Sequence, residues 1–201
     1  MTKRLLHVGA QKWPKHSEIL EIFCGRGNGL KALASLGFTN LRGVDLSADL
    51  LQLYDGDAQL FVGDCRDIRL PDASVDIVVV QGGLHHLTDL PGDLERTFGE
   101  IRRLLRPSGR FVMIEPWLTP FLRLVHTAVQ NAIVRRSWSK LAALNTMIQC
   151  EKVTYFNWLS RKEEILRLLH ANFRPARECI GWGKIAFVGT LVTNDLHTSP
   201  N

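Results

Sequence analysis

Short apolar runs alternate with stretches of helical spacing through the first 115 residues of this 201-residue chain. The apolar runs predict buried strands at 17–23, 41–46, 58–62, 75–80 and 110–115. Between them, the helical spacing predicts helices at 28–36, 47–54 and 90–105. Strands that alternate with helices in this way are typical of a doubly wound α/β sheet with helices on both faces.

The pattern changes after residue 115. The spacing predicts mainly helical structure at 116–144, a helix at 161–172, and strands at 176–180 and 185–192 that a GWGK turn joins into a hairpin. The sequence therefore predicts a Rossmann-like, seven-stranded sheet that is mostly parallel and ends in a C-terminal antiparallel hairpin. We expect a single domain over residues 1–201, with a helical insertion at about 117–160 over the C-terminal edge of the sheet.

The composition is that of a folded protein, with 45% hydrophobic and 22% charged residues. The net charge of +5 favours an anionic partner, although a solvated helical face explains the basic excess between residues 117 and 177 equally well. No run has the length of a signal peptide core or a membrane span. The four cysteines are scattered, and no cluster of His, Cys or acidic residues has metal-ligand spacing. We therefore expect reduced thiols, a cytoplasmic location and no bound metal.

The run ILEIFCGRGNGL at residues 19–30 ends a predicted strand in three glycines at alternate positions. A glycine turn between a strand and a helix lets a ligand touch the backbone and points free N–H groups at negative charge. The dinucleotide fingerprint G-x-G-x-x-G would need glycine where this chain has Leu30. Asp45 ends the second predicted strand, where an acid commonly binds ribose. The loop and Asp45 therefore predict a site for a nucleoside, whereas Leu30 argues against binding of a dinucleotide pyrophosphate. The alternative is a tight turn without a ligand, beside a solvated Asp45.

Two further motifs follow predicted strands, FVGDCRDIRLP at 61–71 and QGGLHHL at 81–87, and LRPSGR at 105–110 precedes the fifth. With the glycine loop, they make residues 17–115 resemble the class I S-adenosylmethionine-dependent methyltransferases, in particular those that act on small molecules. The resemblance implies S-adenosyl-L-methionine as the cofactor. It implies cofactor contacts from Glu21, Phe23, Gly25, Arg26, Gly27, Asp45, Leu46, Asp64, Cys65, Gln81 and Gly82.

Individual roles follow from the same resemblance. Glu21 and the loop at 25–27 match the acid and backbone that contact the methionine amino and carboxylate groups. Asp45 matches the acid that binds the ribose, and Asp64 matches the acid that meets the adenine. The family usually has Gly where this chain has Phe23, a residue that occurs at that place in several nucleic-acid methyltransferases. Phe23 either packs under the first helix or crowds the methionine end of the site.

The acceptor side offers three candidate catalytic residues. Methyl transfer depends chiefly on alignment, and a general base is needed only when the acceptor arrives protonated. His86 is the leading candidate for contact with the acceptor and His85 the second, since a neutral imidazole accepts a proton near pH 7. Glu115 ends the fifth strand at the same edge. Either histidine could instead bond the loop backbone, and the proline after Glu115 suggests a turn role equally well. His126 and Tyr155 are candidates to line the pocket.

The segment at 117–136 has apolar residues on one side of a helix and polar residues mostly on the other. A lid that packs on the sheet is one interpretation, and a peripheral membrane contact through which a lipid-like acceptor enters is the other.

The sequence thus predicts an S-adenosylmethionine-dependent methyltransferase that acts on a small, hydrophobic acceptor. RNA is an alternative acceptor, but the chain lacks the Asn/Asp-Pro-Pro-aromatic motif of enzymes that methylate exocyclic base nitrogens and has no Pro-Cys dipeptide. A non-catalytic cofactor-binding protein or scaffold is a further alternative.

Overall fold

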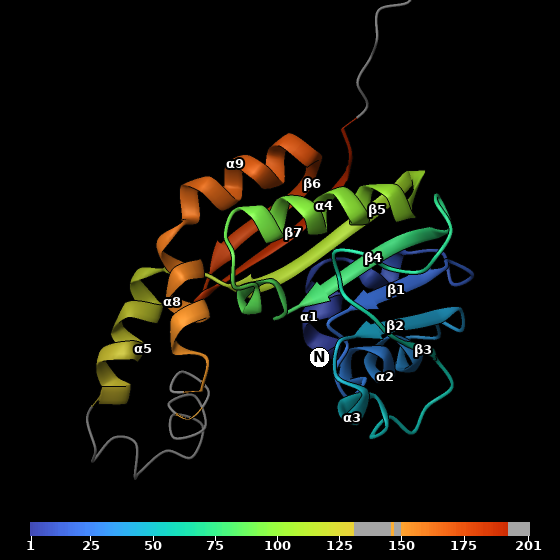
Figure 1. Ribbon diagram of the computed structural model, residues 1–201, viewed down its shortest axis with the longest axis horizontal. Coiled ribbons are helices and arrows are strands. Elements are labelled where there is room, and N and C mark those ends of the chain that lie inside the picture. The colour runs from blue at the N-terminus through green and yellow to red at the C-terminus, as the bar shows by residue number, and fades with distance from the viewer. Residues whose placement is uncertain (131–145, 147–149, 193–201) are drawn as a thin grey trace, which may run out of the picture.

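The computed structural model describes residues 1–130, 146 and 150–192 (Figure 1). The end of the helical stretch predicted at 116–144 therefore lies outside the described residues. None of the helices in the described part of the chain is both long enough and apolar enough to traverse a membrane.

One seven-stranded sheet runs through the molecule in the order β3-β2-β1-β4-β5-β7-β6. Its strands are β1 (Ile19–Ile22), β2 (Leu41–Asp45), β3 (Gln59–Val62), β4 (Val75–Gln81), β5 (Leu105–Pro116), β6 (Phe173–Gly181) and β7 (Lys184–Leu191). The first five strands pair in parallel, whereas β7 is antiparallel to both β5 and β6. The fold class predicted from the sequence is confirmed.

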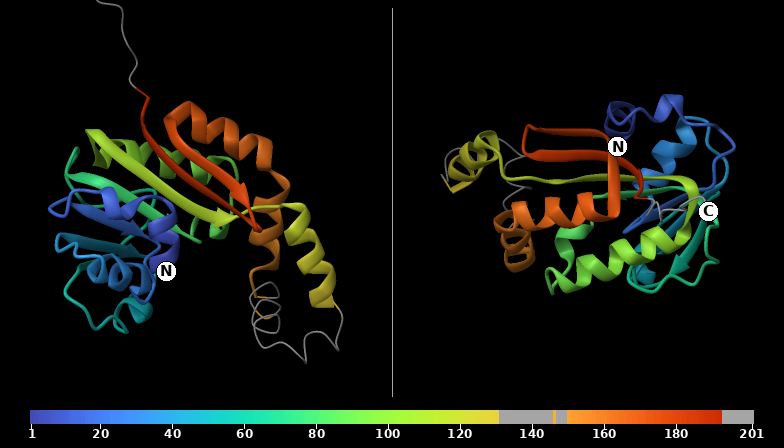
Figure 2. Two further views of the ribbon diagram at one scale, coloured as in Figure 1. Left: turned by 180° about the vertical axis from the view of Figure 1, so that it is seen from behind. Right: turned by 90° about the horizontal axis from the view of Figure 1, so that it is seen from above.

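Helices cover both faces of the sheet, and Figure 2 shows the two layers on either side of the strands. The first layer contains α1 (Thr2–His7), a 3-10 turn η1 (Ala10–Lys12) and α2 (Asn28–Ser35), which pack over β1 and β4. The opposite layer contains α4 (Gly92–Leu104) and α9 (Lys162–Asn172). The central strands β1 and β4 are buried almost throughout, which is why their sequences read as continuous apolar runs.

The structure differs from the predicted elements in three places. The segment 105–109, which precedes the fifth strand in the prediction, belongs to β5 because Leu105 pairs with Val75 before a register shift. The helix expected at 47–54 is limited to α3 (Ala48–Leu51). The six-residue α1 was not predicted, because it is too short for its apolar spacing to stand out.

The predicted insertion contains α5 (Pro120–Gln130) and α8 (Lys152–Ser160), which lie side by side beyond the C-terminal ends of β4 and β5 (Figures 1 and 2). Trp158 ties α8 to the sheet, since its indole Nε1 donates to the Pro116 carbonyl at 2.9 Å. His126 of α5 meets the Tyr155 hydroxyl of α8 at 3.1 Å. These contacts place the helix pair at the sheet edge where parallel α/β folds bind ligands.

Candidate functional site

The C-terminal ends of β1, β2 and β3 surround a space of about 460 Å³, here called the strand-end cleft. Seven of the predicted cofactor residues line it: Phe23, Gly25, Asp45, Leu46, Asp64, Cys65 and Gly82. Neither Arg26 nor Gly27 lines the cleft. The Arg26 side chain is exposed, and Gly27 is the N-cap residue of α2. Leu50, Arg66 and Asp93 also line the cleft but were not predicted. Leu50 and Asp93 lie in helices that carry no recognisable motif, whereas Arg66 lies within the motif at 61–71, where the resemblance assigned contacts only to Asp64 and Cys65.

Asp45 holds the glycine loop in place. Its Oδ2 accepts a hydrogen bond from the Gly25 N–H at 2.7 Å, and its Oδ1 accepts from the Ser47 N–H at 2.9 Å. The carboxylate therefore faces the cleft from a fixed position, with lone pairs left for the hydroxyls of a ribose.

Phe23 has a backbone φ of +60°, which is rare for a bulky residue and explains why Gly is usual at this place in the family. Its ring packs against the core on the α4 side of the sheet, opposite α2. The expectation that Phe23 lies under the first helix is therefore wrong, because the left-handed backbone turns the side chain toward the loop after β4. A Cβ atom at Gly83 in that loop would lie 2.3 Å from the Phe23 ring, so only glycine fits there.

Glu21 and Gln81 form a buried pair beside the glycine loop. The Gln81 Nε2 donates to Glu21 Oε1 at 3.1 Å. Burial raises the pKa of Glu21 to about 8, although the bond from Gln81 opposes the shift. Among the described residues, Glu21 Oε2 and Gln81 Oε1 have no hydrogen-bond partner. Glu21 does not line the strand-end cleft, and Gln81 lines a second cavity instead.

Asp64 is held as an anion by Arg66. The guanidinium bonds both carboxylate oxygens, and these hydrogen bonds lower the pKa of Asp64 to about 2. Arg66 also reaches Asp93 at 2.6 Å, which joins the third strand's loop to α4. The neighbouring Cys65 thiol is buried, and burial raises its pKa to about 11, so its side chain is unreactive at neutral pH.

A larger cavity of about 960 Å³, here called the helix-side cavity, lies between β5, α5, α8 and the turn between β6 and β7. Its apolar wall consists of Ile114, Phe121, Leu122, Leu124, Val125 and Trp182. Tyr155 lines it as expected, whereas His126 contacts Tyr155 from outside the lining. Gly82 and His86 line both this cavity and the strand-end cleft.

Glu115 fixes the histidine loop against β5. Its Oε1 accepts from the backbone N–H groups of Gly83 and Leu84 at 2.8 and 3.1 Å. Its Oε2 meets His85 Nδ1 at 2.8 Å. Burial alone would lower the pKa of His85, but the bond and charge of Glu115 and the charge of Glu151 raise it overall. Because all three contacts are internal, Glu115 acts as a positioning group, although it remains at the cavity wall.

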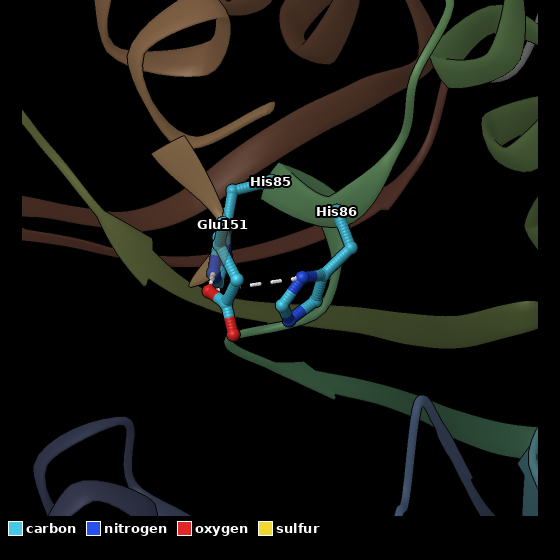
Figure 3. A group of neighbouring side chains, drawn as sticks. All are labelled: His85, His86 and Glu151. Carbon is cyan, nitrogen blue, oxygen red and sulfur yellow. Dashed lines mark ion pairs between the residues drawn. The ribbon is translucent and has the colours of Figure 1, made fainter. Parts of the chain in front are cut away.

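Figure 3 shows the Glu151 carboxylate beside His85 and His86, whose ring centroids lie 4.2 Å apart. Glu151 Oε2 lies 3.5 Å from His85 Nε2 and 3.8 Å from His86 Nδ1. Burial, followed by the charge of His85, lowers the pKa of His86, which favours a neutral ring. Sequence spacing did not reveal Glu151, because it precedes α8, far along the chain from the histidines.

Comparison with known proteins identifies the framework. Residues 20–113 match the model of a methyltransferase domain. This stretch of the chain is similar to methyltransferase domains, the class that the sequence resembles. The match implies S-adenosylmethionine as the cofactor, in agreement with the resemblance of residues 17–115.

Three proteins illustrate the similarity. The chain is 30% identical over 118 residues to a demethylmenaquinone methyltransferase of Symbiobacterium thermophilum, covering 53% of this chain and 45% of that protein. It is 29% identical to the ubiquinone/menaquinone biosynthesis C-methyltransferase UbiE of Acidiphilium cryptum, covering 70% and 56% of the two chains. The chain thus spans about half the length of these curated relatives. The fold matches the PH0226 protein of Pyrococcus horikoshii with a TM-score of 0.68, 21% identity, and coverage of 94% and 89%.

The residues of the methyltransferase domain fit S-adenosylmethionine. Glu21 Oε2 and Gln81 Oε1 are buried acceptors without partners in the described part of the chain, which suits a methionine ammonium group. Asp45 faces the strand-end cleft where a ribose would lie, and Leu46 and Leu50 add apolar surface for the adenine.

Proposed function

We propose that the protein transfers a methyl group from S-adenosylmethionine to a small, largely apolar acceptor bound in the helix-side cavity. The observation that carries the proposal is the cavity itself, about 960 Å³ of space with a mainly apolar wall. His85, His86 and Glu151 form a polar cluster in its wall, and His86 also lines the strand-end cleft. Such a cavity suits a ligand with one polar end and an apolar body.

The names of the relatives support the same class of acceptor. One is named for demethylmenaquinone, and the other for C-methylation in ubiquinone and menaquinone biosynthesis. A quinol precursor combines a hydroxylated ring with an apolar chain, which suits a cavity lined by both a polar cluster and apolar side chains. We therefore favour a hydroxylated aromatic acceptor with an apolar substituent, methylated at carbon.

Each residue has a distinct part in this proposal. S-adenosylmethionine supplies a methyl group made electrophilic by its sulfonium. Asp45 accepts the ribose hydroxyls, and Glu21 with Gln81 receives the ammonium group. His86 lines both spaces and is placed to contact the polar end of the acceptor. His85 acts as a positioning residue, since Glu115 fixes its ring.

Methyl transfer from tritium-labelled S-adenosylmethionine tests the proposal. The acceptors are a short-chain prenylated demethylmenaquinol, a catechol without the chain, and a structured RNA. We expect label in the prenylated quinol, loss of transfer in Asp45→Ala, and at least a tenfold loss in His86→Ala. His170→Ala, which changes an exposed histidine far from both spaces, serves as the control. Label found only in the RNA would show that RNA, and not a quinol, is the acceptor. Binding of the cofactor without any methyl transfer would favour a non-catalytic role.

A peripheral membrane contact is proposed at the rim of the same cavity, where α5 meets the β6–β7 turn. Leu124 is 68% exposed and Trp182 is 81% exposed. The ring of Phe121 lies edge-on to Trp182 at 5.1 Å between centroids. Arg4 and Lys184 line the cavity beside them and would face anionic headgroups. Residues 131–136 of the predicted membrane segment lie outside the described residues.

Vesicle flotation tests this contact. We expect full-length protein to float with phosphatidylglycerol vesicles at low salt and to float less with phosphatidylcholine vesicles, because the rim is basic. The double variant Phe121→Ser, Trp182→Ser should reduce flotation at least threefold. Equal recovery of the variant and the parent protein would refute the contact without affecting the choice of acceptor.

A further inference from the structure

Three side chains with metal-binding atoms converge where the strand-end cleft meets the helix-side cavity. His85 Nε2, His86 Nδ1 and Glu151 Oε2 come from the turn η2 (Leu84–His86) and the start of α8 (Figure 3). The ligand atoms of these residues all lie within 4.8 Å of one another. Two elements distant in sequence thus present two imidazoles and one carboxylate to the same small volume.

The contacts around His85 and Glu151 leave one ligand atom of each available. Glu115 occupies His85 Nδ1, which directs His85 Nε2 toward Glu151. The Glu151 Oε2 atom is buried, and it has no hydrogen-bond partner among the described residues. At 3.5 and 3.8 Å it is too far from either imidazole nitrogen for a good hydrogen bond. An unsatisfied carboxylate oxygen near one nitrogen of each imidazole is better explained by a cation than by direct pairing.

We propose that His85, His86 and Glu151 bind a divalent transition-metal ion of the zinc type. Zinc lies about 2.0–2.2 Å from His nitrogen and carboxylate oxygen, so two ligands of a tetrahedral site are about 3.4 Å apart. The separations of 3.5 and 3.8 Å are close to that value. Two His and one Glu with a fourth position left for water or substrate is a known arrangement of catalytic zinc.

The contact behind His85 is the one that such an ion requires. A histidine that ligates a metal usually donates its second N–H to a carboxylate or a carbonyl, which fixes the tautomer and the ring orientation. Glu115 fills this role at 2.8 Å from His85 Nδ1, and two backbone N–H groups hold the carboxylate in turn. The support for a metal ligand is therefore already built into the end of β5.

The role of this ion in catalysis rests on the proposed function, methyl transfer to an acceptor in the helix-side cavity. All three ligands line the helix-side cavity, so the fourth coordination position faces the space assigned to the acceptor. A hydroxyl oxygen of the acceptor bound there would lose its proton more readily, because the cation stabilises the resulting anion. His86 then meets the polar end of the acceptor through the ion.

Zinc titration of the full-length, chelator-treated protein tests the site without cofactor or acceptor. By calorimetry we expect one ion per chain, with affinity at least tenfold weaker in His86→Ala and in Glu151→Gln. The parent protein should also gain thermal stability with zinc, whereas Glu151→Gln should gain none. His170→Ala is the matched control, because His170 pairs with Glu178 at 2.7 Å in an exposed histidine–glutamate pair outside the cluster.

Three results would overturn the site. The first is unchanged zinc affinity in Glu151→Gln, and the second is no zinc binding to the folded parent protein at a 100-fold molar excess of zinc. The third is loss of zinc binding in the double variant Cys150→Ser, Cys179→Ser but not in Glu151→Gln, which would assign the ion to the exposed thiols. Circular dichroism confirms that each variant is folded. Because methyl transfer is not the readout, zinc bound at the cluster without transfer to any quinol would retain the site and refute the proposed function.

Discussion

At the scale of single residues, Phe23 and Gly83 occupy adjoining space on neighbouring strand ends. A Cβ atom at Gly83 would lie 2.3 Å from Cγ and 2.5 Å from Cβ of Phe23, so neither residue tolerates enlargement of the other. We expect Gly83→Ala to destabilise the protein by about 1–3 kcal/mol through overpacking. In a Phe23→Gly background the same change should cost much less, because both close contacts are gone.

Urea unfolding of the four proteins in this cycle measures the coupling. Gly99→Ala is the control, since Gly99 lies in α4 with nothing within 4 Å of its added Cβ. That change should stabilise the helix by about 0.5–1 kcal/mol. Equal costs for Gly83→Ala with and without Phe23 would show that the contact does not govern this loop.

Glu21 gives the protein a pH dependence of known sign. Its pKa is raised from 4.5 to about 8 by burial, so the folded state holds a proton that the unfolded state releases earlier. Its contribution to stability is complete below pH 4.5 and is lost as the pH rises through 8. Over that window, the unfolding free energy should fall by up to about 1.4 kcal/mol per pH unit relative to Glu21→Gln. Chemical denaturation of both proteins at several pH values tests this, and parallel pH profiles would contradict it.

At the scale of elements, the end of β5 holds the turn η2 through one side chain. Glu115→Ala leaves two buried N–H groups and His85 without an acceptor, so we expect a loss of roughly 3 kcal/mol or more in unfolding free energy. Glu115→Gln keeps an oxygen for the two N–H groups and should lose about 1 kcal/mol. Denaturant unfolding compares them, and equal losses would mean that the backbone contacts contribute little.

Helix α5 has two leucines with opposite expected roles. Leu122 is buried and packs against the turn at Gly183, whereas Leu124 is 68% exposed beside the helix-side cavity. We expect Leu122→Ala to cost about 2–4 kcal/mol in stability. Leu124→Ala should change stability by less than about 0.5 kcal/mol and raise KM for the apolar acceptor with little change in kcat. An unchanged KM would remove Leu124 from the acceptor site.

At the scale of the whole molecule, the sequence was enough to predict the sheet but not the full lining of its cavities. Apolar runs such as VDIVVV in β4 are buried on both faces, and Asp45 ends its strand where the pattern predicted. Glu151 and Trp182 reach the site only through tertiary packing, so no local spacing marks them. Phe23 was noticed, but its direction depends on a positive φ that the sequence does not encode locally.

The strand-end cleft and the helix-side cavity have separate walls, and among the described residues they share only Gly82 and His86. If each space is reached by its own entrance, neither ligand has to pass through the other's space. We therefore expect random-order kinetics, in which either substrate binds first and either product leaves first. Product-inhibition patterns at fixed and varied acceptor measure this. An obligatory order with the cofactor binding first would instead mean that the bound cofactor shapes the acceptor's entrance. The shared residues Gly82 and His86 would then couple the two binding steps.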